Sequence, residues 1–288
     1  MKTTLMRRIP ILLSLFTWTA LVGFGQDLPR QGAYANTQLS AAAGLIQYQD
    51  LATSPLVYSG FHVDFGFGKL YRNAKRDFEM QYGIGGGLLA SNAPEQVLSA
   101  SSAAYQINAK MDFAYMFSLL FNDSEKWRVN VGPKMDFMLQ YRINPSLQNA
   151  AIGIDGFMNL MVATKVEYHW NTVSKKKAIE RSKMVYARFN AGLLNFNVRP
   201  GYNYLSSKPV IGDLQVDDYQ KDERSTAALT MNGYRYQAEV GMSISRKNSR
   251  SNQVAYVFDG IYAPGRFEPL GTMFHQIKYT LNLQKIKK

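Results

Sequence analysis

Residues 127–142 read WRVNVGPKMDFMLQYR, in which apolar and polar side chains alternate. Successive side chains of a β-strand point to opposite faces, so this stretch predicts a strand with one apolar and one polar face. The apolar face holds Trp127, Val129, Val131, Met135, Phe137, Leu139 and Tyr141. The polar face holds Arg128, Asn130, Gly132, Lys134, Asp136, Met138, Gln140 and Arg142.

The same alternation recurs along the chain and predicts ten strands. They span residues 37–49, 55–71, 77–90, 104–120, 126–142, 151–170, 183–204, 229–245, 252–262 and 272–285. The first and ninth alternate least clearly, so eight or twelve strands also fit. The seventh changes face near Leu193–Leu194, which predicts a β-bulge there.

The connections between these segments alternate in character. Four are short and charged, at residues 72–76, 122–125, 171–182 and 246–251. The others vary more, at 50–54, 91–103, 143–150, 205–228 and 263–271. Tight turns alternating with longer loops are typical of an antiparallel up-and-down transmembrane β-barrel. We call the two ends of such a barrel the tight-turn end and the loop end, and an even strand count places both termini at the tight-turn end.

Alternation alone leaves open a soluble, lipocalin-like barrel with its apolar face inside. The apolar-out arrangement is favoured because the segments are long enough to cross a bilayer and because aromatic residues gather at their ends. Those near the tight turns are Tyr71, Phe78, Phe121, Trp127, Tyr168, Trp170 and Tyr186. Those near the loops are Tyr58, Tyr105, Tyr141, Tyr202, Tyr204, Tyr262 and Phe274.

The first 25 residues have the layout of a secretory signal peptide. Lys2, Arg7 and Arg8 precede an apolar run, Ile11–Val22, and cleavage is expected before Gln26. A membrane-anchor helix is the alternative, but the run is shorter than the roughly 20 residues that a span needs. Residues 26–288 then form a single barrel domain. A mean hydropathy of −0.23 argues against a bundle of transmembrane helices. The absence of cysteine excludes disulfides, thiolate metal sites, a cysteine nucleophile and a lipidated cysteine.

In signal and strand pattern the chain resembles the outer-membrane β-barrel proteins of Gram-negative bacteria. The Gln26 start and the Tyr-rich strands look like barrels of the Bacteroidota. The resemblance implies residence in the cell outer membrane, in contact with its lipid. The chain departs from the family by ending on Lys285-Ile286-Lys287-Lys288 rather than on an aromatic residue.

An apolar-out barrel turns its polar faces, and their charges, inward. The predicted lumen network comprises Asp64, Glu79, Lys110, Asp112, Arg128, Lys134, Asp136, Lys165, Glu167, Arg188, Arg235, Glu239, Asp259 and Lys278. The seven acids balance the seven bases, which indicates a narrow or filled lumen rather than an ion-selective pore. Cross-strand pairs are predicted for Asp112 with Lys134, Asp136 with Lys165, Glu167 with Arg188, and Asp259 with Lys278.

The net charge of the mature chain, +9 from 30 bases and 21 acids, is expected at the tight-turn rim. This predicted basic periplasmic rim comprises Arg72, Lys75, Arg76, Lys175, Lys176, Lys177, Arg181, Arg246, Lys247 and Arg250. It suits anionic lipid head groups, or an acidic periplasmic or cell-wall partner. Export makes nucleic acid an unsuitable partner.

Candidate chemistry is sparse, so we expect no enzyme. Of the three histidines, His62 lies two residues from Asp64 on the inner face, His169 lies beside Glu167, and His275 falls on the lipid face. No metal site and no cofactor are expected. The sequence predicts a non-enzymatic structural, binding or accessory outer-membrane protein. A small-solute channel, and a lipid hydrolase or protease centred on His62 or His275, are the alternatives.

Overall fold

The described residues form β-strands joined by short connections. The computed structural model describes residues 34–285 except for 52–53, 55, 92–101, 122–125, 146, 148–151, 175–178, 201–226, 231–232, 247–249 and 265–268. Its strands are β1 (Tyr34–Asp50), β2 (Tyr58–Arg72), β3 (Arg76–Ser91), β4 (Ser102–Phe121), β5 (Trp127–Ile143), β6 (Ile152–Ser174), β7 (Ile179–Pro200), β8 (Ala227–Thr230), β9 (Tyr234–Arg246), β10 (Arg250–Ala263) and β11 (Leu270–Lys285). The predicted signal peptide lies outside the described residues. No described helix is long and apolar enough to cross a membrane.

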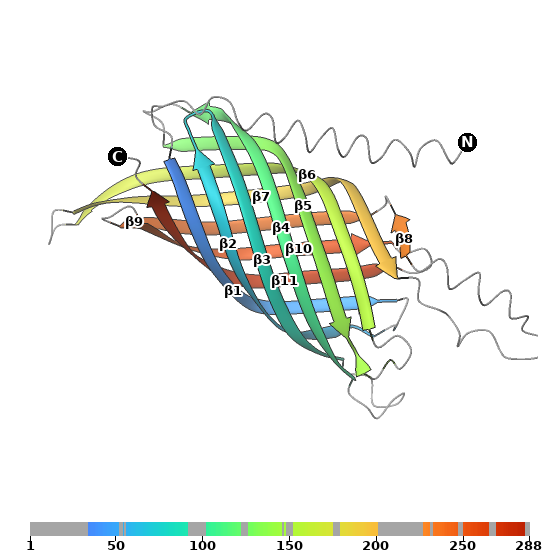
Figure 1. The fold of residues 1–288 in the computed structure, drawn as a ribbon. Helices are drawn as coiled ribbons and strands as arrows, with labels where there is room; N and C mark the ends of the chain where they lie inside the picture. Colours follow the sequence, from blue (N-terminus) through green and yellow to red (C-terminus); the bar gives the residue numbers. More distant parts are fainter. Residues whose placement is uncertain are drawn as a thin grey trace, which may run out of the picture. The chain divides into compact units, whose positions relative to one another are not determined.

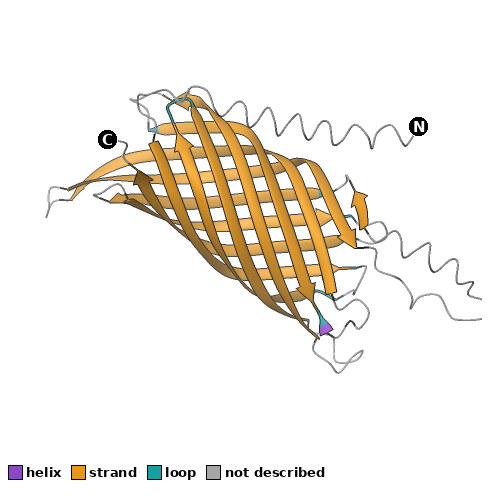
Figure 2. Cartoon of the chain, in the orientation of Figure 1, coloured by secondary structure: helices purple, strands orange, loops and turns teal. Residues whose placement is uncertain are grey.

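Ten of these strands close into an antiparallel barrel (Figures 1 and 2). Each strand pairs with its neighbours in the chain, and the ring is completed where β1 pairs with β11 and β7 pairs with β9. The short β8 adds to the loop end of β7, outside the ring. A closed ring leaves no unpaired sheet edge, which is the condition for crossing a bilayer with strands. The predicted ten-stranded transmembrane barrel is confirmed.

All ten predicted segments form strands, including the first and the ninth. The predicted bulge is also present, because Leu160 pairs with Leu194 and Met161 with Gly192, which leaves Leu193 as the extra residue. The short strand β8 was not predicted.

One predicted turn, residues 171–182, is wrong. The strands β6 and β7 stay paired as far as Ser174 and Ile179, whereas β5 stops pairing at Tyr168 and β9 at Lys183. The two strands therefore continue as a ribbon beyond the rim (yellow-green in Figure 1). The segment includes the β-branched residues Thr172 and Val173, which favour strand conformation.

The apolar faces point outward. In β5, Leu139 is 55% exposed while its neighbour Gln140 is 0% exposed. This arrangement excludes the lipocalin-like alternative, because it places the polar faces inside. Aromatic side chains pack together on the outer face near both ends, with Trp127 against Tyr168 at the tight-turn end and Tyr234 against Tyr262 at the loop end.

Three aromatic residues predicted for these outer rings lie inside the barrel instead. Tyr186 is 4% exposed, and its hydroxyl donates to Glu239 at 2.5 Å. Tyr58 and Phe274 are buried in an apolar cluster at the loop end of the lumen. Each of the three lies at a position of its strand that points inward. The alternation along the strand therefore predicts the side on which an aromatic residue lies better than its closeness to the strand end does.

This cluster, which we call the apolar plug, fills the loop end of the lumen. Its members are Ile46, Tyr48, Tyr58, Leu89, Ala104, Met138, Phe157, Ile261, Ala263, Leu270 and Phe274. They come from eight of the ten barrel strands and none is more than 6% exposed. Side chains from so many strands therefore pack together across the lumen.

Candidate functional site: the lumen

All fourteen predicted lumen charges make ion pairs inside the barrel, but their partners differ from most of those predicted. Of the four predicted pairs, only Asp112 with Lys134 forms, at 3.4 Å. The other predicted acids and bases pair with different residues, and several of these contacts cross the lumen instead of joining adjacent strands. Long Arg and Lys side chains reach the opposite wall of so narrow a barrel.

Arg235 on β9 is the clearest contact across the lumen. Its side chain is fully buried and pairs with Asp259 on the neighbouring β10 at 2.8 Å. Its Nη1 donates to Asp136 on β5, which β7 and β6 separate from β9 around the ring. Lys134 likewise reaches Gln237 on β9 at 2.6 Å. These bonds link β5 to β9 across the lumen.

A second group of ion pairs lies toward the tight-turn end and forms one alternating chain of charges, which we call the charge chain. It runs from Arg128 through Asp77, Arg72, Glu167, Lys165 and Glu79 to Arg188. The N–O distances of its first five links lie between 2.7 and 3.3 Å, and its last link joins Glu79 to Arg188. Because its members come from β2, β3, β5, β6 and β7, it also bridges the lumen.

Arg72, a member of this chain, corrects the predicted rim. Arg72 was predicted on the basic rim, but it is 7% exposed and points into the lumen, and Asp77 is fully buried opposite it. Both positions continue the inward alternation of their strands, so following that pattern to the strand ends would have found them.

The rest of the predicted basic rim is only partly described. Lys75 and Arg76 are exposed. The side chains of Lys175, Lys176, Lys177, Arg181, Arg246, Lys247 and Arg250 lie outside the described part of the structure.

His62 lies fully buried in the middle of the barrel. Its Nδ1 is 3.3 Å from Asp64 and 2.9 Å from the Gln276 amide, and its Nε2 is 2.8 Å from the Asn108 amide. Phe274 of the plug packs edge-on against the ring. Gly85 and Gly87 leave room for it, because a Cβ built on Gly85 would lie 2.7 Å from the imidazole.

The other two histidines do not join this cluster. His169 contacts Glu167 at 3.2 Å near the tight-turn end, and His275 accepts or donates a 2.7 Å hydrogen bond with Tyr256 on the outer face. No group of three or more potential metal ligands is found among the described residues.

A further ion-pair cluster covers the plug at the loop end and was not predicted. Arg142 pairs with Asp50 and Asp155, each at 3.0 Å, and its guanidinium lies over the ring of Tyr48. All three charged residues are buried, so the loop end is closed by apolar packing and by charges.

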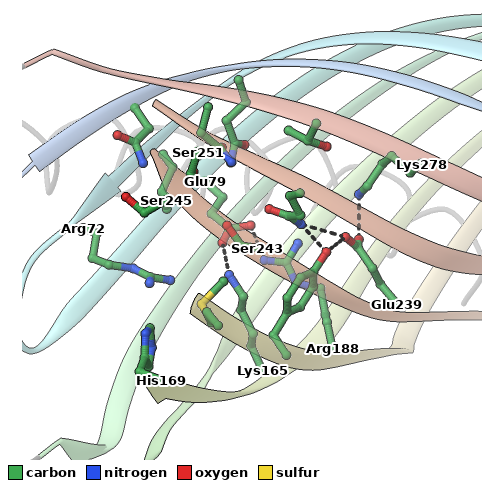
Figure 3. Close-up of a pocket in the computed structure, with 18 of the residues that line it drawn as sticks. Arg72, Glu79, Lys165, His169, Arg188, Glu239, Ser243, Ser245, Ser251 and Lys278 are labelled. Atoms are coloured by element: carbon green, nitrogen blue, oxygen red, sulfur yellow. Dashed lines mark hydrogen bonds and ion pairs between the residues drawn. The ribbon is translucent and has the colours of Figure 1, made fainter. Parts of the chain in front are cut away.

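The tight-turn end, by contrast, is hollow. A cavity of 270 Å³, which we call the cup, lies between the charge chain and the polar walls of β1, β9, β10 and β11 (Figure 3). It adjoins a deeper cavity of 140 Å³, because Gln38, Arg188, Glu239 and Lys278 line both. Ser182, at the edge of the cup, is exposed.

Comparisons with known proteins give no family for this chain. No family model matches it, and no curated protein sequence matches it. Similar solved structures include the outer membrane protease OmpT from Escherichia coli, with 5% identity over 91% of this chain and 99% of that one and a TM-score of 0.48. The transport unit of the autotransporter AIDA-I from Escherichia coli has 10% identity, coverages of 92% and 94%, and a TM-score of 0.41. The COG4313 outer membrane channel from Pseudomonas putida F1 has 7% identity, coverages of 91% and 98%, and a TM-score of 0.32.

These three structures have different activities, and with TM-scores below 0.5 none of them assigns one here. The strand register and the outward apolar faces define the class by themselves. The protein is a transmembrane β-barrel whose lumen is crossed by its own ion pairs.

Proposed function

We propose that this protein is an outer-membrane barrel that neither conducts solutes nor catalyses a reaction, and that it serves as a binding or accessory membrane protein. The supporting observation is the occluded lumen. Arg235 links β9 to β5 across the lumen, and beyond it the apolar plug occupies the loop end.

The occlusion argues against the channel alternative. An open pore needs a continuous water-filled path, usually lined by one sign of charge to select ions. Here acids and bases alternate and neutralise one another, and Ile46, Leu270 and Phe274 of the plug are 0% exposed. A barrel of ten strands is also close in size to those that side chains fill, and far from porins with about 16–18 strands.

The placement of His62 and His275 argues against a hydrolase or protease centred on either of them. A general base must reach the proton that it removes from a substrate. His62 has a carboxylate beside it but no exposed surface, and His275 lies on the outer face with a tyrosine hydroxyl as its partner. Neither position brings a histidine and a carboxylate together where a substrate can enter.

The outer surface supports residence in the outer membrane. Apolar side chains cover the outer face of every long strand, which suits lipid acyl chains. The exposed Lys75 and Arg76 in the first tight turn suit anionic head groups or an acidic cell-wall partner on the periplasmic side.

Planar-bilayer recording tests the proposal. The refolded mature barrel should show no openings above leak, whereas a variant with Leu270→Ala and Phe274→Ala, which removes two fully buried plug residues, should show them more often. Regular openings of the unmodified barrel would overturn the non-conducting assignment.

Activity profiling tests the second half of the proposal. The His62→Ala and His275→Ala variants should leave lipid and peptide profiles unchanged. Hydrolysis that the unmodified barrel performs and either variant loses would identify an enzyme.

A further inference from the structure

The cup has two unlike walls. The wall built by β1, β9, β10 and β11 carries one ion pair, Glu239 with Lys278, among neutral polar side chains, namely Asn36, Gln38, Ser243, Ser245, Ser251, Gln253, Thr280 and Asn282. The facing wall carries the end of the charge chain (Figure 3). A ligand that satisfies both walls must combine hydroxyl groups with a charge.

The neutral wall suits a hydroxylated body. Ser243 on β9 and Ser251 on β10 line the cavity, and Ser245 lies directly opposite Ser251 in the strand register. A serine hydroxyl both donates and accepts, as do the hydroxyls of a sugar ring. Within the described part of the barrel, these three hydroxyls make no side-chain hydrogen bond.

The facing wall suits an anion. Of the charge chain, the bases Arg72, Lys165 and Arg188 line the cup with one acid, Glu79. The last base of the chain, Arg188, shares Glu79 with Lys165, and only the Nη2 of Arg188 hydrogen-bonds a side chain in the described barrel. Lys278 lines the same cavity and is 17% exposed beyond its pair with Glu239.

We propose that the cup binds a small molecule that carries one oxyanion on a hydroxylated body, such as a sugar acid or a sugar phosphate, entering from the tight-turn end. The oxyanion lies at Arg188 and Lys278, and the hydroxyls face Ser243, Ser245 and Ser251. A free guanidinium edge recognises carboxylate and phosphate oxygens alike. Cavities of 270 and 140 Å³ fit a molecule of monosaccharide size.

Calorimetric titration of the folded mature barrel in detergent at low salt tests this site. Glucuronate and glucose 6-phosphate are the two anionic probes, and glucose and inorganic phosphate are the controls that lack either the charge or the ring. The anionic sugars should bind with a Kd of about 0.1–1 mM, which is ordinary for ligands of this size. Both controls should bind at least about tenfold more weakly, because each satisfies one wall only.

A comparison of the Kd values of glucuronate and glucose 6-phosphate shows whether the site prefers a carboxylate or a phosphate group. Binding of neither anionic sugar, or binding of glucose as tight as theirs, would overturn the site.

Cup-filling variants then place the binding. Ser243→Leu adds bulk to the neutral wall without changing its charge and should weaken both anionic sugars at least about tenfold. Ser251→Leu, on the neighbouring strand, is the second such variant if the first does not fold. The matched control is Ser59→Leu, whose side chain is exposed on the outer face.

Arg188→Lys keeps a positive charge beside Glu79 but removes the guanidinium edge. It should weaken the anionic sugars about tenfold and leave glucose unchanged. Wild-type affinity in the folded cup-filling variants would show that the sugars bind elsewhere. Conductance is measured independently, so the barrel can stay non-conducting while the cup fails to bind.

Discussion

Replacing Arg235 by methionine should destabilise the barrel strongly. The guanidinium is 0% exposed, donates to Asp259 from Nε at 3.2 Å and from Nη2 at 2.8 Å, and donates to Asp136 from Nη1. Methionine fills a similar volume but leaves two buried carboxylates without their cation. Removing one partner of a buried ion pair costs about 3–5 kcal/mol, so the free energy of unfolding should fall by that amount.

Urea unfolding of the barrel in lipid vesicles, followed by the gel shift between folded and heated samples, measures this change. Adding Asp136→Asn and Asp259→Asn to Arg235→Met removes the uncompensated charges and should restore most of the lost stability. The exposed Arg76→Met is the control and should change stability by less than about 0.5 kcal/mol. The reasoning fails if Arg235→Met unfolds at the wild-type midpoint, or if the triple variant is no more stable than the single one.

Three further changes test the wall and the lumen by the same unfolding measurement. Ile84→Arg, at the middle of an outward face, should lower the free energy of unfolding by about 2–4 kcal/mol, whereas Leu119→Arg near the tight-turn end should lower it by about 1 kcal/mol or less. Equal losses would contradict a bilayer around the barrel. Gly85→Ala pushes a methyl group against the imidazole of His62 and should lower the free energy of unfolding by about 1–3 kcal/mol, while Gly86→Ala on the outer face should leave it nearly unchanged. The reverse order would contradict the assigned faces. Tyr186→Phe removes a 2.5 Å hydrogen bond to a buried carboxylate and should cost about 1.5–3 kcal/mol, and no loss would place that hydroxyl in water.

The strands were predictable because their pattern is set by two different solvents. Lipid on one face and a confined polar lumen on the other force a strict alternation, and this fixes both the face and the approximate length of each strand. The face change near Leu193 was predictable for the same reason, since one extra residue exchanges the two faces.

The pairing inside the lumen was not predictable from alternation. Alternation gives the face of a residue but not its height in a tilted barrel, and ion pairing depends on height. Lys165 was expected beside Asp136, yet it contacts Glu79 and Glu167. The contacts across the lumen also depend on the barrel diameter, which only the closed ring defines.

The apolar plug left a signal in the sequence. Met138 and Phe157 interrupt polar faces at inward positions, and Tyr58 and Phe274 do so near the strand ends. Taken alone, each can be assigned to an interface ring. Together they indicate an apolar cluster, because all of them fall at inward positions near the same end of the barrel.

The lumen has opposite properties at its two ends, and this asymmetry limits what the protein can do. At the loop end, Arg142 and the plug exclude water, while at the tight-turn end the cup leaves Lys278 and Arg188 within reach of a solute. In the proposed non-conducting barrel, molecules exchange with one compartment only, so a solute is bound there and not passed across. Opening it would require breaking the Arg235 contacts and separating the plug. The cost of losing these contacts in the low-dielectric interior makes spontaneous opening rare, and this favours a binding role over transport.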